Sequence, residues 1–190
     1  MVRRQSSQLQ ATAYHEAGHA VYAFRSFVRI KRISIEPKDD YVGQVRHGRV
    51  VWGNPELSTS NRTRSSLERA IQISLAGQIA QRRFNARSVR TWQARSDHQC
   101  AVDLALRCCG SGRTATAFLK YLTFCVEDAL FAPINWRLVE ALAKELLTKK
   151  VMNGKEAEAF LLAQLGCSTK SIKTADSTTI TLARSRVLRQ

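Results

Sequence analysis

The chain has 190 residues, which is the length of one domain with a short appendage. With 44% hydrophobic and 24% charged residues it can bury a core, and this excludes wholesale disorder. Lys and Arg number 30 against 15 Asp and Glu, and 17 of these basic residues but only 7 of the acidic ones lie in residues 1–100. The excess predicts attraction to anionic partners such as nucleic acid, acidic lipid or acidic peptide.

The five cysteines are odd in number and include no pair at CxxC spacing, which favours a reducing compartment over a disulfide framework. The N-terminal residues are polar and contain no apolar signal core, and no stretch approaches the length of a membrane span. We therefore expect a cytoplasmic protein with no membrane-spanning segment.

In the first third of the chain, apolar residues at three- and four-residue steps predict an amphipathic helix over residues 8–27. Ile33 and Ile35 alternate with polar residues, which predicts a strand, and residues 37–40 have the composition of a turn. Residues 41–52 are predicted to form a second extended stretch or a hairpin. Only a small sheet is expected.

The chain after residue 58 is predicted to be helical, with a polar basic loop over residues 84–96. The first of these helices is expected to end near residue 83, and the next to start near residue 97. Three more helices are expected over residues 114–131, 134–150 and 154–165. The fold class is therefore mainly α with a small β-sheet or hairpin. Residues 1–167 are expected to form the domain, and the basic, Ser/Thr-rich residues 168–190 a mobile tail.

The chemistry-bearing segment is AYHEAGHA, residues 13–20. At 3.6 residues per turn, His15 and His19 lie one above the other on a helix face and can bind one ion. Glu16 is offset by about 100°, so it can accept a proton from metal-bound water without being a ligand. Imidazole with a carboxylate suits Zn²⁺, and a third ligand must come from elsewhere in the chain.

The same residues could be ordinary polar side chains that happen to spell HExxH. The chain has only four histidines, so their composition makes this pattern unlikely by chance. The spacing alone therefore favours a metal site.

AYHEAGHA, the alternating Ile33 and Ile35, the helical motif Leu75-Ala76-Gly77-Gln78-Ile79-Ala80 and then Ser96-Asp97 together resemble the peptidase domain of FtsH-type ATP-dependent zinc metalloproteases. The resemblance covers about residues 10–165 and is most specific at the HExxH helix. It implies a helical zinc-metallopeptidase domain. It also implies that Asp97, which precedes an apolar helical stripe, is the third zinc ligand.

Several alternatives to this ligand set remain open. Asp97 could cap the N-terminus of a helix, because Asp before a helical stripe satisfies free backbone N–H groups. His98 could substitute for it as a ligand, whereas Asp103 is expected to face solvent. The cysteines of this region are expected to be small core or surface residues: Cys100, Cys108 and Cys109.

The chain departs from the family in three respects, the first being that no stretch is long enough to serve as the family's membrane anchor. Gln81 replaces a glutamate that the family usually has at the end of the Leu-Ala-Gly motif, and we expect it still to form hydrogen bonds. No GxxxxGK(S/T) phosphate loop occurs in the sequence, so ATP-driven unfolding is not expected from this chain. A separate ATPase partner could supply this unfolding activity.

The stretch before Asp97 is basic and contains Trp92. The resemblance implies that its arginines line the cleft and favour acidic substrates, although a solvated loop is an equal alternative. Together with the basic tail they could instead contact phosphates. The arginines are Arg82, Arg83, Arg87, Arg90 and Arg95. Residues 43–51 resemble the family's substrate-facing edge strand, to which an extended peptide could add, although a closed hairpin whose edge is already covered is the alternative.

These observations predict a zinc-dependent endopeptidase that acts on unfolded or short polypeptides, with His15, His19 and Asp97 holding the ion and Glu16 activating water. The alternative is a catalytically silent zinc-binding relative that uses its basic surface to bind a partner or nucleic acid. The sequence specifies neither the substrate nor the oligomeric state.

Overall fold

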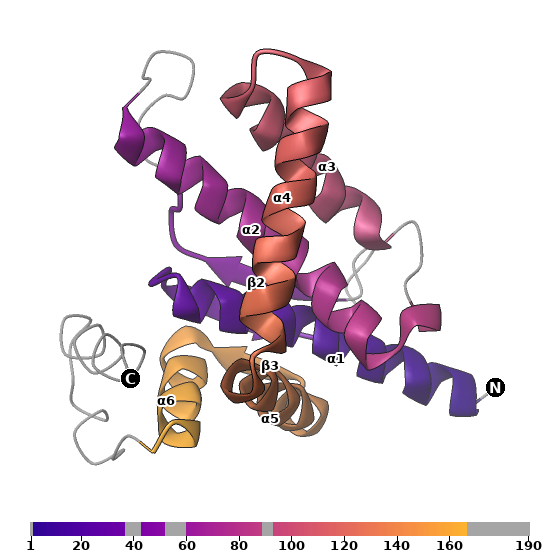
Figure 1. Ribbon diagram of the computed structural model, residues 1–190. Coiled ribbons are helices and arrows are strands. Elements are labelled where there is room, and N and C mark those ends of the chain that lie inside the picture. The colour runs from indigo at the N-terminus through magenta and orange to yellow at the C-terminus, as the bar shows by residue number, and fades with distance from the viewer. Residues whose placement is uncertain (1, 37–42, 52–59, 89–92, 167–190) are drawn as a thin grey trace.

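The computed structural model describes residues 2–36, 43–51, 60–88 and 93–166 (Figure 1). It is mainly helical with a small antiparallel sheet, which confirms the predicted fold class. In chain order the elements are α1 (Val2–Arg25), β1 (Ile30–Ser34), β2 (Gln44–His47), α2 (Asn61–Phe84), the 3₁₀ turn η1 (Ala86–Ser88), α3 (Gln93–Cys108), α4 (Gly112–Phe131), α5 (Pro133–Lys149), β3 (Val151–Asn153) and α6 (Gly154–Gln164).

Helices α1 and α2 form the centre of the fold, where α2 crosses α1 (Figure 1). Small residues let their backbones approach closely. A Cβ added to Gly18 of α1 would lie 2.5 Å from the Ala80 Cβ and 2.6 Å from the Ala76 oxygen of α2. Helix α2 begins at a regular N-cap, because the Ser60 side chain accepts a hydrogen bond from the Thr63 N–H.

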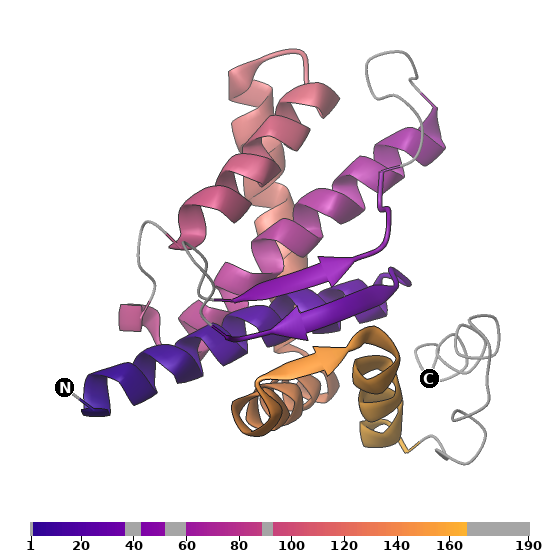
Figure 2. The ribbon, with the colours of Figure 1, turned by 180° about the vertical axis from the view of Figure 1, so that it is seen from behind.

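The sheet has the order β2-β1-β3, and both pairings are antiparallel. Ile33 and Ile35 are fully buried, as their alternation predicts. Ile33 lies opposite Val45 on one side and Met152 on the other. In Figure 2 strand β1 lies in front of α1, and both β1 and β2 contact α1, so this part of the sheet packs on the HExxH helix, whereas β3 contacts α5.

Strand β3 was not predicted, because three residues between two helices are too few to show a period. It pairs with β1 from the far end of the domain. The residue that follows it, Gly154, lies against β1, and a Cβ there would be 1.8 Å from the Ile30 oxygen. Glycine is therefore required for the chain to pass this close to β1.

The C-terminal helices bury the apolar stripes read from the sequence. Helix α4 buries Leu122, Val126 and Leu130, α5 buries Leu138, Leu142 and Leu146, and α6 buries Leu161, all at 2% exposure or less. Their bounds differ from the predicted ones by no more than two residues at either end. None of the described helices is long and apolar enough to cross a membrane.

Two predicted helix starts are wrong, since α1 begins at Val2, six residues before the predicted start, and α3 begins before residue 97; the latter excludes the capping alternative for Asp97. The predicted loop over 84–96 is shorter than expected, because η1 occupies part of it and α3 already begins at Gln93. Asp97 therefore lies inside α3, four residues after its start, and does not cap it. The predicted turn over 37–40 and the tail over 168–190 lie outside the described residues.

Candidate metal centre

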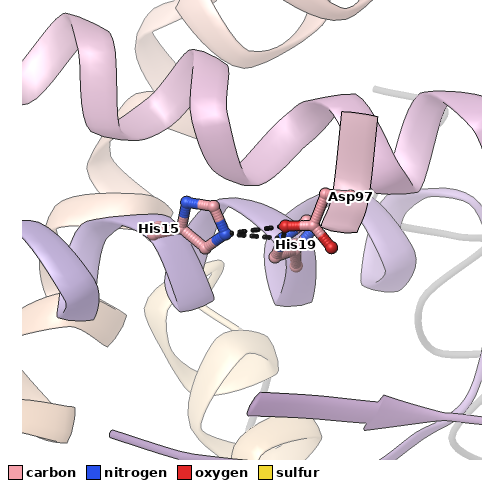
Figure 3. A group of neighbouring side chains, drawn as sticks. All are labelled: His15, His19 and Asp97. Atoms are coloured by element: carbon pink, nitrogen blue, oxygen red, sulfur yellow. Dashed lines mark hydrogen bonds and ion pairs between the residues drawn. The ribbon is translucent and has the colours of Figure 1, made fainter. Parts of the chain in front are cut away.

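Three side chains from two distant segments converge on one point. His15 and His19 project from adjacent turns of α1, and Asp97 reaches them from α3 (Figure 3). The Asp97 Oδ2 lies 3.0 Å from the His15 Nε2 and 3.2 Å from the His19 Nε2, and the two Nε2 atoms are 3.0 Å apart. The structure thus brings together the three residues predicted as metal ligands.

The opposite nitrogen of each imidazole has a hydrogen-bond acceptor. His19 donates from Nδ1 to the Ile73 carbonyl oxygen at 2.7 Å, and His15 donates from Nδ1 to the Gln81 Oε1 at 3.0 Å. The Gln81 amide is itself oriented, because its Nε2 donates to the Ser88 carbonyl at 3.0 Å. With the proton on Nδ1, each Nε2 keeps the lone pair that a metal ligand needs.

The electrostatics of the cluster favour a positive charge at its centre. His15 and His19 are each only 8% exposed, and burial by itself lowers the pKa of His19. The Asp97 carboxylate overcomes burial and raises that pKa to about 9. Burial raises the pKa of Asp97, but the two histidines outweigh it and hold this pKa well below its usual range. A proton or a metal cation would each supply the positive charge.

The donor set fits Zn²⁺. Tetrahedral zinc with bonds of 2.0–2.1 Å separates its ligand atoms by about 3.3 Å, close to the 3.0–3.2 Å between the three atoms here. Two imidazoles and one carboxylate would leave the fourth position of a tetrahedral ion open. Among the residues that the structure describes, no cysteine joins this cluster.

Glu16 lies beside the cluster and is not part of it. Its side chain is buried, at 5% exposure, and burial raises its pKa. The Val45 N–H of β2 donates a hydrogen bond to its carboxylate. Gly43 also lies against it, since a Cβ added there would be 2.6 Å from the Glu16 Oε1. The carboxylate is therefore held between α1 and the start of β2.

Gly77 of α2 makes room for the second histidine, a role that sequence reasoning missed. A Cβ added at this position would lie 2.3 Å from the His19 Nε2. The Ile73 carbonyl, one turn earlier on α2, holds the other side of the same ring. A glycine in the middle of a strongly patterned helix was the available signal, because it weakens a helix unless packing requires it.

The other candidates for a ligand lie apart from the cluster. His98 is exposed, and Asp103 faces solvent and accepts a hydrogen bond from the Gln99 side chain. Cys100 is exposed and receives a weak hydrogen bond from Ser74, whereas the other two candidates, Cys108 and Cys109, pack partly buried against the core.

The basic stretch before Asp97 does not behave as one group. Arg83 stacks over the rings of Phe131 and Trp136, with its guanidinium carbon 4.4 Å and 4.2 Å from their centroids, so it serves packing. Arg82, Arg83 and Arg87 are all exposed. Of the remaining predicted residues, Arg90 and Trp92 lie outside the described residues, as does the side chain of Arg95.

Comparison with known proteins found no family model and no curated protein that matches this chain.

Proposed function

We propose that this protein is a zinc-dependent endopeptidase of the kind found in FtsH-type peptidase domains, acting on unfolded or short polypeptides. The observation that carries the proposal is the convergence of two buried imidazole Nε2 atoms on the Asp97 carboxylate, with a buried glutamate beside them. Each imidazole is held in the tautomer that leaves Nε2 free for a cation.

His15, His19 and Asp97 would hold the ion. Zinc, when bound at such a site, acts as a Lewis acid and makes its bound water acidic enough to ionise near neutral pH. Glu16 would accept the proton of the attacking water at a carboxylate oxygen and deliver it to the leaving amine. Burial supports this role, because it raises the pKa of Glu16 toward the range in which a carboxylate can both take up and release a proton.

The edge strand β2 is suited to align an extended polypeptide with this site. In the described sheet β2 has a partner on one side only, since the order is β2-β1-β3. The Val45 N–H bonds to Glu16 and so points away from β1. A polypeptide that added to this edge through main-chain hydrogen bonds would pass beside the Glu16 carboxylate.

Removal and restoration of the metal tests the proposal. Dialysis of the purified chain against 1,10-phenanthroline should abolish hydrolysis of a reduced, carboxymethylated protein substrate, and about one equivalent of Zn²⁺ should restore it. Activity is measured by release of fluorescent fragments, and zinc content by elemental analysis. Full activity in chain shown to be free of metal would refute a zinc peptidase. A chain that binds zinc and cleaves none of a varied set of unfolded substrates would support a silent metal-binding protein.

A further inference from the structure

We propose that the outer face of strand β2, through Arg46 and its neighbour Arg32, selects polypeptides that carry an acidic residue close to the bond to be cleaved. This inference rests on the proposed function and adds a substrate class to it. It arises from the register of the sheet and not from the arginines before Asp97.

Arg32 and Arg46 lie directly opposite each other in the antiparallel pair β1–β2. Their neighbours Ile33 and Val45 point inward, one fully buried and the other packed against the core. Because side chains alternate along a strand, the two arginines project from the opposite, outer face. Both side chains are exposed.

Like charges directly opposite in a sheet destabilise the pair. Among the residues that the structure describes, neither of these two guanidinium groups forms an ion pair. The surroundings add further positive charge, since three exposed basic residues flank them in the paired segments 29–32 and 46–49: Arg29, Lys31 and Arg49. No acidic residue occurs in either segment. An anion that lies across the pair would relieve this repulsion.

The position of Arg46 indicates which anion would bind across this pair. It follows Val45, whose N–H is bonded to Glu16, so Arg46 is one residue from the point where the catalytic carboxylate meets the strand. A polypeptide added to the edge of β2 would place one side chain opposite Arg46 on the outer face, with the two Cβ atoms about 5 Å apart. A glutamate or aspartate there would contact the guanidinium within one or two residues of the scissile bond.

Nucleic acid fits this surface less well. Base stacking on aromatic rings contributes much of the affinity for a single strand. The outer-face residues that pair in the described strands are Arg32, Ser34, Gln44, Arg46, Val151 and Asn153, with the exposed Lys31 beside them, and none of these is aromatic.

Binding is measured first, so that it can be separated from catalysis. Fluorescent twelve-residue peptides with Glu, Gln or Lys at each of five central positions are titrated against zinc-loaded Glu16→Gln chain and followed by anisotropy. At one position Glu should bind about two- to fivefold more tightly than Gln, the range of an exposed ion pair, and Lys more weakly. Raising the salt concentration should reduce the difference.

Variants then locate the preference. Arg46→Gln should remove it, and Arg46→Glu should reverse it in favour of Lys. Arg113→Gln, which removes an exposed arginine at the start of α4, should leave it unchanged. Equal binding of the three peptides at every position, absence of peptide binding, or a preference that survives Arg46→Gln would overturn the inference.

A cleavage assay and an oligonucleotide-binding assay distinguish this inference from the alternative functions. Cleavage by the wild-type chain without a charge preference would leave the peptidase intact and overturn the inference. Selective binding without any cleavage would support recognition of acidic residues by Arg46 and overturn the peptidase. If a twelve-nucleotide oligo(dT) bound through Arg46 while peptides showed no preference, the surface would be a nucleic-acid interface.

Discussion

Replacement of Glu16 by glutamine is expected to reduce hydrolysis of an unfolded polypeptide by about 10²- to 10⁴-fold, the usual contribution of a general base. Glutamine keeps the size of the side chain and can still accept the hydrogen bond from the Val45 N–H. It cannot accept a proton from water. Zinc content should stay at the wild-type level, because Glu16 lies outside the cluster formed by His15, His19 and Asp97.

A carboxylate elsewhere on the surface provides the control for this variant. Glu68→Gln removes an acidic group that pairs with Arg64 on α2, 3.3 Å away, and should leave both zinc content and activity unchanged. Hydrolysis is followed at saturating substrate, and zinc by elemental analysis of the same samples. If Glu16→Gln kept wild-type activity, Glu16 would not be the base.

Replacement of Gly77 by alanine is expected to weaken zinc binding by at least about 100-fold, the upper end of the losses caused by disturbing groups around a ligand. The added Cβ would lie 2.3 Å from the His19 Nε2, the atom that faces the ion. The ring has little freedom to move away, because it is buried and its Nδ1 bonds to Ile73. Within a helix, replacement of glycine by alanine normally stabilises the helix by about 1 kcal/mol. Helix propensity therefore does not account for a loss of zinc affinity.

A second substitution distinguishes a clash with His19 from general unfolding. In the background of Gly77→Ala, His19→Ala removes the imidazole, and the double variant should have a higher melting temperature than Gly77→Ala alone. Gly112→Ala on α4 is the neutral control, since an added Cβ there meets no atom within 4 Å. The packing account would be contradicted if Gly77→Ala bound zinc with wild-type affinity, or if removal of the imidazole gave no recovery.

The local part of the site could be read from the sequence because it depends on helix periodicity alone. His15 and His19 are one turn apart on α1, so any helix containing them places both imidazoles on the same face. Asp97 is different, since nothing local predicts a contact with a residue 82 positions away. The prediction of Asp97 as a ligand came from the resemblance to the FtsH-type family. The local pattern by itself suggested that Asp97 caps a helix, and the earlier start of α3 excludes that role.

The parts that escaped prediction all depend on how α2 packs against its neighbours. The Ile73 carbonyl and the Gln81 amide hold the two imidazoles only because α2 crosses α1 at this point. The expectation that Gln81 still forms hydrogen bonds is confirmed, but the sequence could not name His15 as its partner. Strand β3 also depends on contacts between distant segments, since its three residues become a strand through pairing with β1.

Zinc K-edge X-ray absorption of the metal-loaded chain tests the central claim most directly. Our account predicts two imidazole nitrogens together with oxygen ligands at about 2.0–2.1 Å, and no sulfur at about 2.3 Å. The imidazole scattering should fall to a single ring in His15→Ala or His19→Ala. A sulfur shell, or a wild-type spectrum with fewer than two imidazoles, would contradict the assignment of His15, His19 and Asp97 as the ligands.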